Sequence, residues 1–270
     1  MSEGRVANVA ILGGGNLGQA LARGWVSSGL FQPSDVHLTR RHPDKLDDLA
    51  AQGFRTGSDN RVAAAEAQCV IVAVQPGQLD TVLSEIGPVL DPARQTVISV
   101  VTGVTLQMIR ETVGSDVPLV RAMPNTAVET LDSMTCLSVA GGEAEGLAIA
   151  TYLFDAVGLT MAIDEDMMIP ATALCACGIA FFLRTIRAAA QGGTEIGFHA
   201  DDALILAAQT ARGAAELVLR GGGHPEGEID RVTTPRGCTI AGLNELEHQG
   251  FSSAMIRGIL TSCRRAEELS

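Results

Sequence analysis

The stretch of sequence that decides the fold reads VANVAILGGGNLGQALARGWV and covers residues 6–26. The apolar run Val6 to Leu12 predicts a β-strand, and the residues from Gln19 to Val26 predict a helix. Between them, residues 13–18 match the pattern G-x-G-x-x-G. In that order the first glycine permits a tight turn, the second lets the backbone approach a pyrophosphate, and the third lets the helix pack closely on the strand. A purely structural loop is the alternative, but the succession of strand, loop and helix favours dinucleotide binding. The candidate cofactor residues of this loop are Gly13, Gly15, Asn16, Leu17 and Gly18.

Further short apolar runs alternate with helical patterns up to about residue 163. They predict strands over Val36–Thr39, Cys69–Val74, Thr96–Val101, Leu119–Arg121 and Thr135–Val139. Because the run from Cys69 is continuously apolar, both of its faces should be covered, as in a parallel sheet with helices on each side. We therefore expect residues 1–164 to form a Rossmann-like, doubly wound α/β domain.

The second part of the chain, residues 165–270, reads as all-helical. Helices are predicted over Met167–Gln191, Ala200–Arg220, Cys238–Gln249 and Ser252–Glu268. The glycines at 192–193 and 221–223 are interpreted as helix ends.

The apolar stretch from Ile169 to Leu183 is interrupted by Pro170 and is shorter than the ~20 residues that span a bilayer, so we interpret it as a buried helix. The apolar helix from Ala203 to Leu219 predicts burial between subunits, in a homodimer or higher homo-oligomer.

Composition excludes several classes of function. The 270 residues carry a net charge of -12, which disfavours nucleic acid as a partner. Of the 19 basic residues only Lys45 is a lysine, so a Walker A loop is absent. Adaptation to high salt and coding bias are alternative explanations of the negative net charge and the scarcity of lysine. The 6 cysteines lie mostly in apolar runs and no signal-peptide pattern is seen at the N-terminus, from which we expect a cytoplasmic protein without a membrane segment.

The tip of the second strand reads Thr39-Arg40-Arg41. An NAD-specific site would carry an acidic residue there for the ribose hydroxyls. A hydroxyl and two guanidinium groups suit a 2′-phosphate instead, so the sequence favours NADPH without excluding NADH. The alternative is that these arginines are merely solvated.

Other candidate cofactor residues follow later strands, where the carboxyl ends of a parallel sheet meet the ligand. These are Asn60, Ala73, Val74, Gln75, Pro76, Val101, Thr102, Met123 and Asn125. Ordinary turns between strands and helices would look much the same.

Residues 232–243 combine hydroxyls, a proline and a glycine ahead of a helical run. A helix N-terminus of this kind has spare amide donors for a small carboxylate, although simple capping explains the same residues. Cys175 and Cys177 are separated by one residue, a spacing that raises the possibility of a metal site. We reject this interpretation because side chains two apart on a helix diverge and no nearby histidine completes a ligand set. We therefore expect no metal site.

Taken together, these motifs resemble the Δ1-pyrroline-5-carboxylate reductase family over nearly the whole chain. The most specific block is Val232 to Leu243, accompanied by residues 13–18, 73–76 and 121–126. The resemblance implies NADPH-dependent hydride transfer to a cyclic imine, giving L-proline, in a Rossmann-like domain followed by a helical dimerisation domain. It also implies that Thr239 contacts the substrate as the catalytic residue, and that the other substrate-binding residues are Glu165, Thr234, Gly237 and Cys238.

The sequence departs from the family pattern in three places. The family usually has Ser-Gly-Ser-Gly-Pro-Ala at residues 175–180, lysine at Gln75 and glycine at Arg236. These departures keep two other functions open, a reductase of another imine or of a 2-hydroxy acid and a non-catalytic dinucleotide-binding paralogue. A 2-hydroxy-acid enzyme typically needs a lysine or histidine base in the first long helix, and Met167 to Gln191 contains neither.

Overall fold

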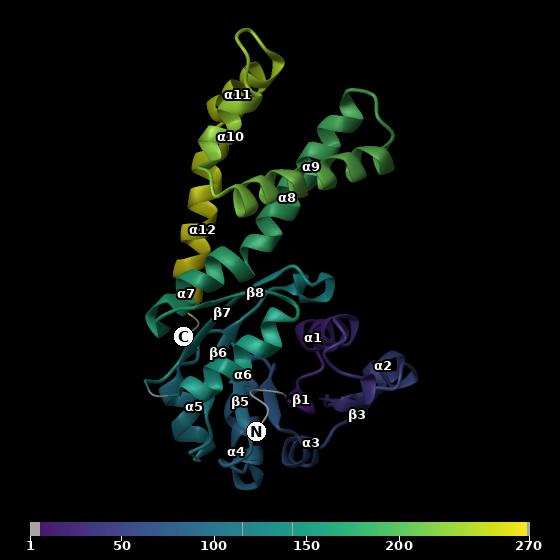
Figure 1. Cartoon of the computed structure of the whole chain (residues 1–270), viewed down its shortest axis with the longest axis vertical. Helices are drawn as coiled ribbons and strands as arrows, with labels where there is room; N and C mark the ends of the chain where they lie inside the picture. Colours follow the sequence, from purple (N-terminus) through teal and green to yellow (C-terminus); the bar gives the residue numbers. More distant parts are fainter. Residues whose placement is uncertain (1–5, 115, 142, 269–270) are drawn as a thin grey trace. The chain divides into compact units, whose positions relative to one another are not determined.

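A computed structural model of the chain describes residues 6–114, 116–141 and 143–268 (Figure 1). The chain divides into two compact units, one made of residues 1–177 with 262–270 and the other of residues 178–261. The compact units separate between Cys177 and Gly178. The predicted domain boundary after residue 164 stays a prediction.

The first unit is built on one eight-stranded sheet with the order β3-β2-β1-β4-β5-β6-β7-β8. Neighbouring strands are parallel except β6 and β7, which are antiparallel. The strands are β1 (Val9–Leu12), β2 (Val36–Thr39), β3 (Arg55–Gly57), β4 (Cys69–Val72), β5 (Thr96–Ser99), β6 (Leu119–Met123), β7 (Ser133–Val139) and β8 (Gly158–Ala162). The predicted α/β class is confirmed. The short strands β3 and β8 were not predicted, and β1, β4 and β5 are shorter than their apolar runs.

Helices cover both faces of this sheet, as the continuously apolar strands require. They are α1 (Asn16–Ser27), α2 (Asp47–Ala51), α3 (Asn60–Glu66), α4 (Leu79–Ile86), α5 (Leu106–Val113), α6 (Ala144–Asp155) and α7 (Met168–Ala171). The two larger apolar cores among the described residues are separate. One contains residues of α1 and α6, and the other contains residues of α3, α4 and α5.

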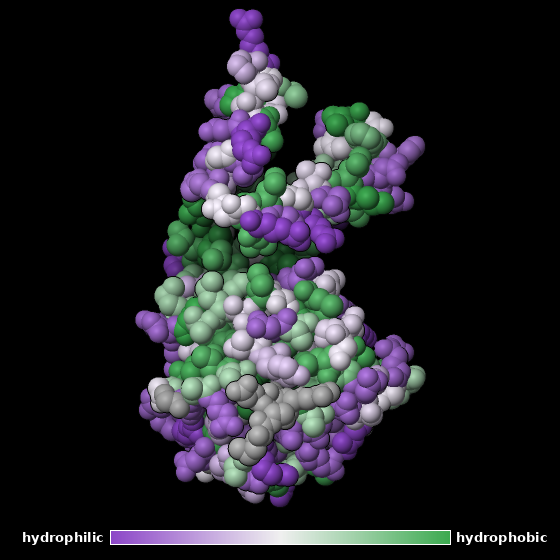
Figure 2. All heavy atoms as spheres, viewed as in Figure 1, coloured by the Kyte–Doolittle hydropathy of each residue, from purple (hydrophilic) through white to green (hydrophobic). Residues whose placement is uncertain are grey.

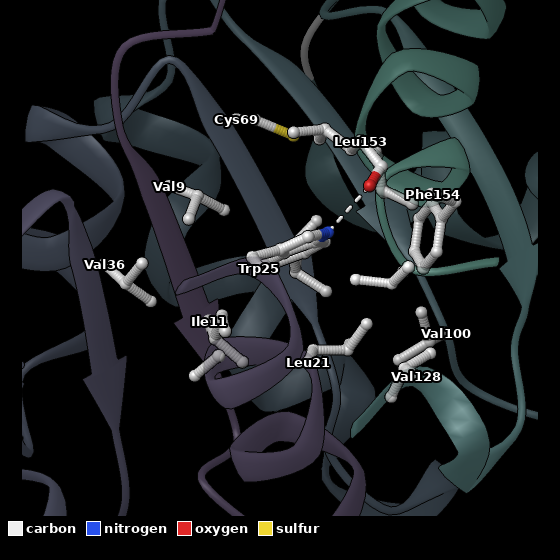
Figure 3. Close-up of a cluster of buried hydrophobic side chains, with 14 of the residues drawn as sticks. Val9, Ile11, Leu21, Trp25, Val36, Cys69, Val100, Val128, Leu153 and Phe154 are labelled. Atoms are coloured by element: carbon white, nitrogen blue, oxygen red, sulfur yellow. Dashed lines mark hydrogen bonds between the residues drawn. The ribbon is translucent and has the colours of Figure 1, made fainter. Parts of the chain in front are cut away.

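Trp25 on α1 fixes the helix that follows the glycine-rich loop (Figure 3). Its ring is fully buried, and its Nε1 donates a hydrogen bond of 2.8 Å to the carbonyl oxygen of Leu153 on α6. The ring also meets Phe154 edge-on, with the centroids 5.9 Å apart. A satisfied indole N–H in a packed aromatic cluster holds α1 rigidly beneath the loop.

The second unit is helical, as predicted. It contains α8 (Gly178–Glu195), α9 (Ala200–Gly221), α10 (Pro225–Val232), α11 (Cys238–His248) and most of α12 (Phe251–Glu267). Helix α9 ends as predicted, with Gly222 in the left-handed conformation at φ 60°. The predicted helix end at Gly192 and Gly193 is wrong, because α8 runs through both residues. A Cβ atom at Gly193 would lie 3.1 Å from the Cβ of Ala203, so this glycine allows α8 and α9 to pack closely.

Apolar side chains are mixed with polar ones on the surface of the second unit (Figure 2). Among its residues only Gly178 and Ala203 are buried, whereas Phe182 is 61% and Ile205 67% exposed. Residues 165–195 form a 31-residue helical segment that contains an 18-residue window with a mean hydropathy of 1.8, and 28% of that window is buried. By length and composition the segment could cross a membrane. Within this chain the segment from Ile169 to Leu183, predicted to be a buried helix, is buried at residues 171–173 and exposed at Phe182 and Leu183. A unit without a core of its own needs a partner to cover it.

Candidate functional site

A cavity of about 560 Å³ opens beside the carboxyl ends of β1, β2 and β4. Its wall is built from the glycine-rich loop, from the residues after β2 and β4, and from the nearby faces of α3 and α4. The predicted cofactor residues that line it are Gly13, Gly15, Thr39, Arg40, Arg41, Asn60, Ala73, Val74 and Gln75. Residues from five separate parts of the sequence are thus brought to one edge of the sheet.

The surroundings of the three motif glycines explain why each position has no side chain. A Cβ atom at Gly13, where φ is 116°, would lie 2.3 Å from the carbonyl oxygen of Ala73, and one at Gly18 would lie 2.3 Å from the oxygen of Gly13. A Cβ atom at Gly15 would meet nothing within 4 Å. The first and third glycines therefore permit close packing, and the second leaves open space over the loop. This is the arrangement that admits a pyrophosphate.

The loop also leaves amide donors unused at the start of α1. The N–H groups of Gly13 and Gly14 both donate to the carbonyl oxygen of Thr39, at 3.1 and 2.8 Å, and that of Gly15 donates to Gly13. By contrast, the N–H groups of Asn16 and Leu17 donate to no acceptor among the described residues. The cap residue Gly15 has no side chain, and the first turn contains no acidic residue. The helix start is therefore suited to an anion.

The two arginines after β2 have different environments. Arg40 is half-buried, and its Nη1 donates a hydrogen bond of 2.9 Å to the carbonyl oxygen of Gly14. Arg41 is exposed at the cavity and forms no ion pair among the described residues. Arg40 thus stabilises the loop, and Arg41 presents a guanidinium group to the cavity that is available to bind a ligand.

A chain of hydrogen bonds joins three polar side chains in the wall of the cavity. The hydroxyl group of Thr39 donates to Oδ1 of Asn60 at 2.6 Å, and Nδ2 of Asn60 donates to Oε2 of Glu85 at 2.8 Å. Asn60 also opens α3, whose cap is Asp59. The chain fixes the orientation of the Asn60 amide.

Several predicted residues lie outside the cavity lining. Asn16 and Pro76 are next to lining residues in the sequence, and Leu17 and Gly18 follow Asn16 on α1. The other four, Val101, Thr102, Met123 and Asn125, follow or end β5 and β6 at the same edge of the sheet. Val101 is in the apolar core, and the side chain of Asn125 caps the turn that begins at Thr126. Their contact with a cofactor stays a prediction.

Sequence reasoning missed some residues that line the cavity, namely Gly14, His42, Ser58, Gly77, Gln78, Thr81, Val82 and Glu85. Several of them directly follow residues that were predicted. Their position just after a strand was the available signal. Thr81, Val82 and Glu85 are on α4, and no local pattern distinguishes that face from an ordinary helix surface.

Glu165 is engaged within the first unit. Its Oε1 accepts hydrogen bonds from the backbone N–H of Leu106, at 2.6 Å, and from Nη1 of Arg121, at 3.1 Å. The Arg121 side chain is only 5% exposed, so this ion pair neutralises a buried cation. The carboxylate therefore fixes the start of α5 to β6.

The remaining predicted substrate residues lie in the second unit, in the turn before α11 and in the first two residues of that helix. The N–H of Gly237 donates to the carbonyl oxygen of Thr234 at 2.9 Å, and Gly237 then caps α11 without a side-chain hydrogen bond. The N–H groups of Cys238 and Thr239 have no acceptor among the described residues. Arg236 adopts the left-handed conformation at φ 62°, which explains why the family pattern has glycine there.

Within the described residues, no three histidine, cysteine or acidic side chains lie together in a way that could hold a metal ion. The groups that line the cavity include backbone amides, hydroxyls and guanidinium groups, whose chemistry is anion binding and orientation.

Comparison with known proteins identifies the family. Residues 165–269 match the family model for pyrroline-5-carboxylate reductase dimerisation, and residues 8–103 match that for NADP oxidoreductase, coenzyme F420-dependent. Pyrroline-5-carboxylate reductase 2 of Dictyostelium discoideum is 46% identical, over 97% of this chain and 92% of that protein. Pyrroline-5-carboxylate reductase 1 of the same organism is 48% identical over 97% of this chain, which spans about half (49%) of that relative.

Solved structures agree with this result. The Coxiella burnetii pyrroline-5-carboxylate reductase superposes with a TM-score of 0.84 at 30% identity, over 98% of both chains. The Plasmodium falciparum pyrroline carboxylate reductase with NADP bound superposes with a TM-score of 0.88, over 99% of both chains, and at 22% identity it shows the same fold. With this fold, with the glycine-rich loop and its cavity, and with relatives that match along its whole length, the chain belongs to the pyrroline-5-carboxylate reductase family.

Proposed function

We propose that the protein reduces Δ1-pyrroline-5-carboxylate to L-proline, with NADPH as the hydride donor. The observation that carries this proposal is the cavity formed by the glycine-rich loop and Arg41, in a chain 46% identical to a pyrroline-5-carboxylate reductase over 92% of that enzyme. NADPH is a hydride donor, and the cyclic C=N bond of the substrate is the acceptor.

The residues of the cavity fit the proposed cofactor. The open space above Gly15 and the unused N–H groups of Asn16 and Leu17 suit its pyrophosphate. Arg41 suits the 2′-phosphate, and Thr39 and Asn60 are oriented by their hydrogen bonds for the ribose. Gln75, at the mouth of the cavity, is where the family has lysine, so this chain places a neutral amide there.

The substrate carboxylate would bind at the start of α11, where Gly237 leaves the backbone N–H groups of Cys238 and Thr239 available. The Thr239 hydroxyl would hydrogen-bond the ring nitrogen, and Thr234 would close the other side of the turn. Glu165 has only Oε2 left for substrate, because Oε1 already accepts two hydrogen bonds.

In this mechanism the protein mainly positions the reactants. Hydride moves to the imine carbon, and the nitrogen retains the proton of the iminium ion, which gives the amine of proline. Because an iminium ion is already electrophilic, we assign orientation of the ring nitrogen to Thr239 instead of primary acid catalysis. Correct alignment of donor and acceptor contributes up to roughly 7–11 kcal/mol in well-oriented systems.

We further propose a soluble, cytoplasmic homodimer or higher homo-oligomer that binds neither nucleic acid nor membrane. The helical unit corresponds to a dimerisation region, and it has almost no buried residues of its own. A second subunit would therefore cover the exposed apolar side chains of this unit.

The test is oxidation of NADPH, followed at 340 nm, with and without Δ1-pyrroline-5-carboxylate. We expect substrate-dependent oxidation that is accompanied by an equal amount of proline. A 2-hydroxy acid and its oxo form serve as control substrates with NADP and NADPH. Turnover of the controls without turnover of the imine would assign a different reductase activity, and no turnover of any substrate would indicate a non-catalytic paralogue.

A further inference from the structure

Two thiols from distant parts of the sequence meet in a small apolar cluster of the first unit. Cys136 is on β7, and Cys175 is in the π-helix η7 (Thr172–Ala176). The largest influence on the pKa of each thiol is a side-chain hydrogen bond to the other. Cys136 is buried with Met123 and Met168, whereas Cys175 packs against the edge of this cluster and is partly accessible. The arrangement combines a sheltered thiol with one that a small reagent can reach.

The backbone around Cys175 is held in place by specific contacts. The N–H of Cys177 donates to the carbonyl oxygen of Thr172 at 2.9 Å, which closes the wide turn of the π-helix. The carbonyl oxygen of Cys175 accepts a hydrogen bond of 3.4 Å from Nδ2 of Asn125 at the end of β6. Residues two positions apart along a helix lie on roughly opposite sides of its axis, so Cys177 points away from the direction of Cys175. Cys175 is thereby the thiol of this segment that faces β7.

We propose that Cys136 and Cys175 are a redox-sensitive pair that forms an intramolecular disulfide on reaction with a hydroperoxide. In the first step the Cys175 thiolate attacks the O–O bond of hydrogen peroxide, becomes a sulfenic acid and releases hydroxide. In the second step the Cys136 sulfur attacks the sulfenic sulfur, so that an S–S bond forms and the S–O bond breaks. The departing hydroxide takes the Cys136 proton as water. Two thiols lose two electrons in total, and one peroxide becomes two waters.

The hydrogen bond assigns the two roles. Donation from the Cys136 thiol lowers the pKa of Cys175 to about 7, although burial acts in the opposite direction. The same hydrogen bond, together with burial, raises the pKa of Cys136. Of the elements packed against η7, α7 has no ionisable side chain, and Arg121 on β6 is paired with Glu165. Cys175 is therefore the attacking thiolate and Cys136 the resolving thiol.

Mass spectrometry of the full-length protein tests the proposal without relying on its catalytic activity. The reduced protein is treated with hydrogen peroxide, its free thiols are blocked, and the unreduced protein is digested. We expect a linked peptide pair containing residues 136 and 175, which disappears on reduction. An unmodified Cys136 beside an oxidised Cys175, or a link that joins Cys136 to Cys177, would overturn the proposal.

Two variants with matched controls distinguish the roles. Cys136→Ser keeps a hydrogen-bond donor but cannot form the disulfide, so Cys175 should accumulate as a sulfenic acid that a dimedone probe labels. Cys177→Ser should leave the 136–175 link intact. In the reduced wild-type protein, alkylation of Cys175 should rise about tenfold from pH 6 to 8 and then level off, against roughly a hundredfold for an ordinary thiol. An ordinary profile together with no link would refute the proposal even if a variant failed to fold.

Discussion

Nη1 of Arg40 donates a hydrogen bond of 2.9 Å to the carbonyl oxygen of Gly14, which ties the tip of β2 to the glycine-rich loop. The backbone reinforces this tie, because the N–H of Gly14 donates to the carbonyl oxygen of Thr39 at 2.8 Å. The residues after β2 therefore have two tasks. They set the shape of the loop through Arg40, and they present a free cation through Arg41.

The different roles of Arg40 and Arg41 predict that substituting each will change the affinities for NADPH and NADH differently. Arg41→Ala should raise the KM for NADPH by about ten- to a hundredfold, as expected for the loss of one charge-assisted hydrogen bond to phosphate, with little effect on NADH. Arg40→Ala should weaken both cofactors, because it loosens the loop that both would use. Steady-state kinetics with the two cofactors measures this. Equal losses for NADH and NADPH in the Arg41 variant would remove the assignment of the 2′-phosphate.

The Thr239 hydroxyl should matter for turnover more than for stability. Thr239→Ala should lower kcat by a hundredfold or less, the lower range for a positioned proton donor, and should leave the KM for NADPH unchanged. Thr239→Ser retains the hydroxyl group and should recover most of the activity. A Thr239→Ala enzyme with wild-type kcat would exclude this residue from the site.

Arg236 has a backbone conformation that an arginine adopts only with strain, at φ 62°. The left-handed conformation costs a residue with a Cβ about 1–2 kcal/mol, and glycine loses about 0.5–1 kcal/mol through its greater freedom when unfolded. Arg236→Gly should therefore increase the free energy of unfolding by about 0.5–1 kcal/mol. As a control, Arg212→Gly inside α9 should decrease it by about 1 kcal/mol. Urea denaturation compares the two, and a destabilised Arg236→Gly protein would contradict the argument.

The exposed apolar surface of the helical unit predicts that the protein associates. Sedimentation should detect no species with the mass of a single chain at micromolar concentration, and the melting temperature should rise with protein concentration. Phe182→Asp should weaken association, since Phe182 is 61% exposed in the chain alone. Met108→Asp on α5 changes a similarly exposed residue of the first unit and should have a smaller effect. A monomeric wild-type protein would refute this prediction.

His37 on β2 makes stability depend on pH. Burial is the main cause that lowers the pKa of His37, with a further contribution from the Arg55 charge, while Glu66 opposes the shift. Because the unfolded chain then binds the proton more tightly, stability should be lost as the pH falls below the ordinary histidine pKa of about 6.5. His37→Gln should reduce the loss between pH 7.5 and 6.0. An equal loss in both proteins would assign it to other groups.

How far the sequence predicts this molecule depends on how local each determinant is. The glycine-rich loop was predictable because the spacing of its glycines, directly between an apolar run and a helical pattern, is itself a local sequence signal. Strand β3 was not, since Arg55, Thr56 and Gly57 carry no apolar signal and are a strand only through pairing with β2. The glycine at 193 was misread as a helix end, because its role depends on Ala203 across a helix contact.

The candidate site shows the same limit. Several residues just after strands were found from their position, whereas Glu85 was missed because it lies on α4 and its hydrogen bond with Asn60 joins residues that are distant in the sequence. The partners of Glu165 were missed as well, because Leu106 and Arg121 are distant in the sequence. The contact between Cys136 and Cys175 is equally non-local, and the sequence showed only two cysteines in apolar runs.

The most direct test of the central claim is isotope transfer in a single turnover. The enzyme would be mixed with NADPH deuterated at the transferable position and with Δ1-pyrroline-5-carboxylate, and the product analysed by mass spectrometry. We expect L-proline with one deuterium at the ring carbon that is bonded to nitrogen and does not carry the carboxylate, in an amount equal to the NADPH oxidised. Oxidation of the cofactor without labelled proline, or no oxidation by a protein that binds NADPH, would contradict the assigned reaction.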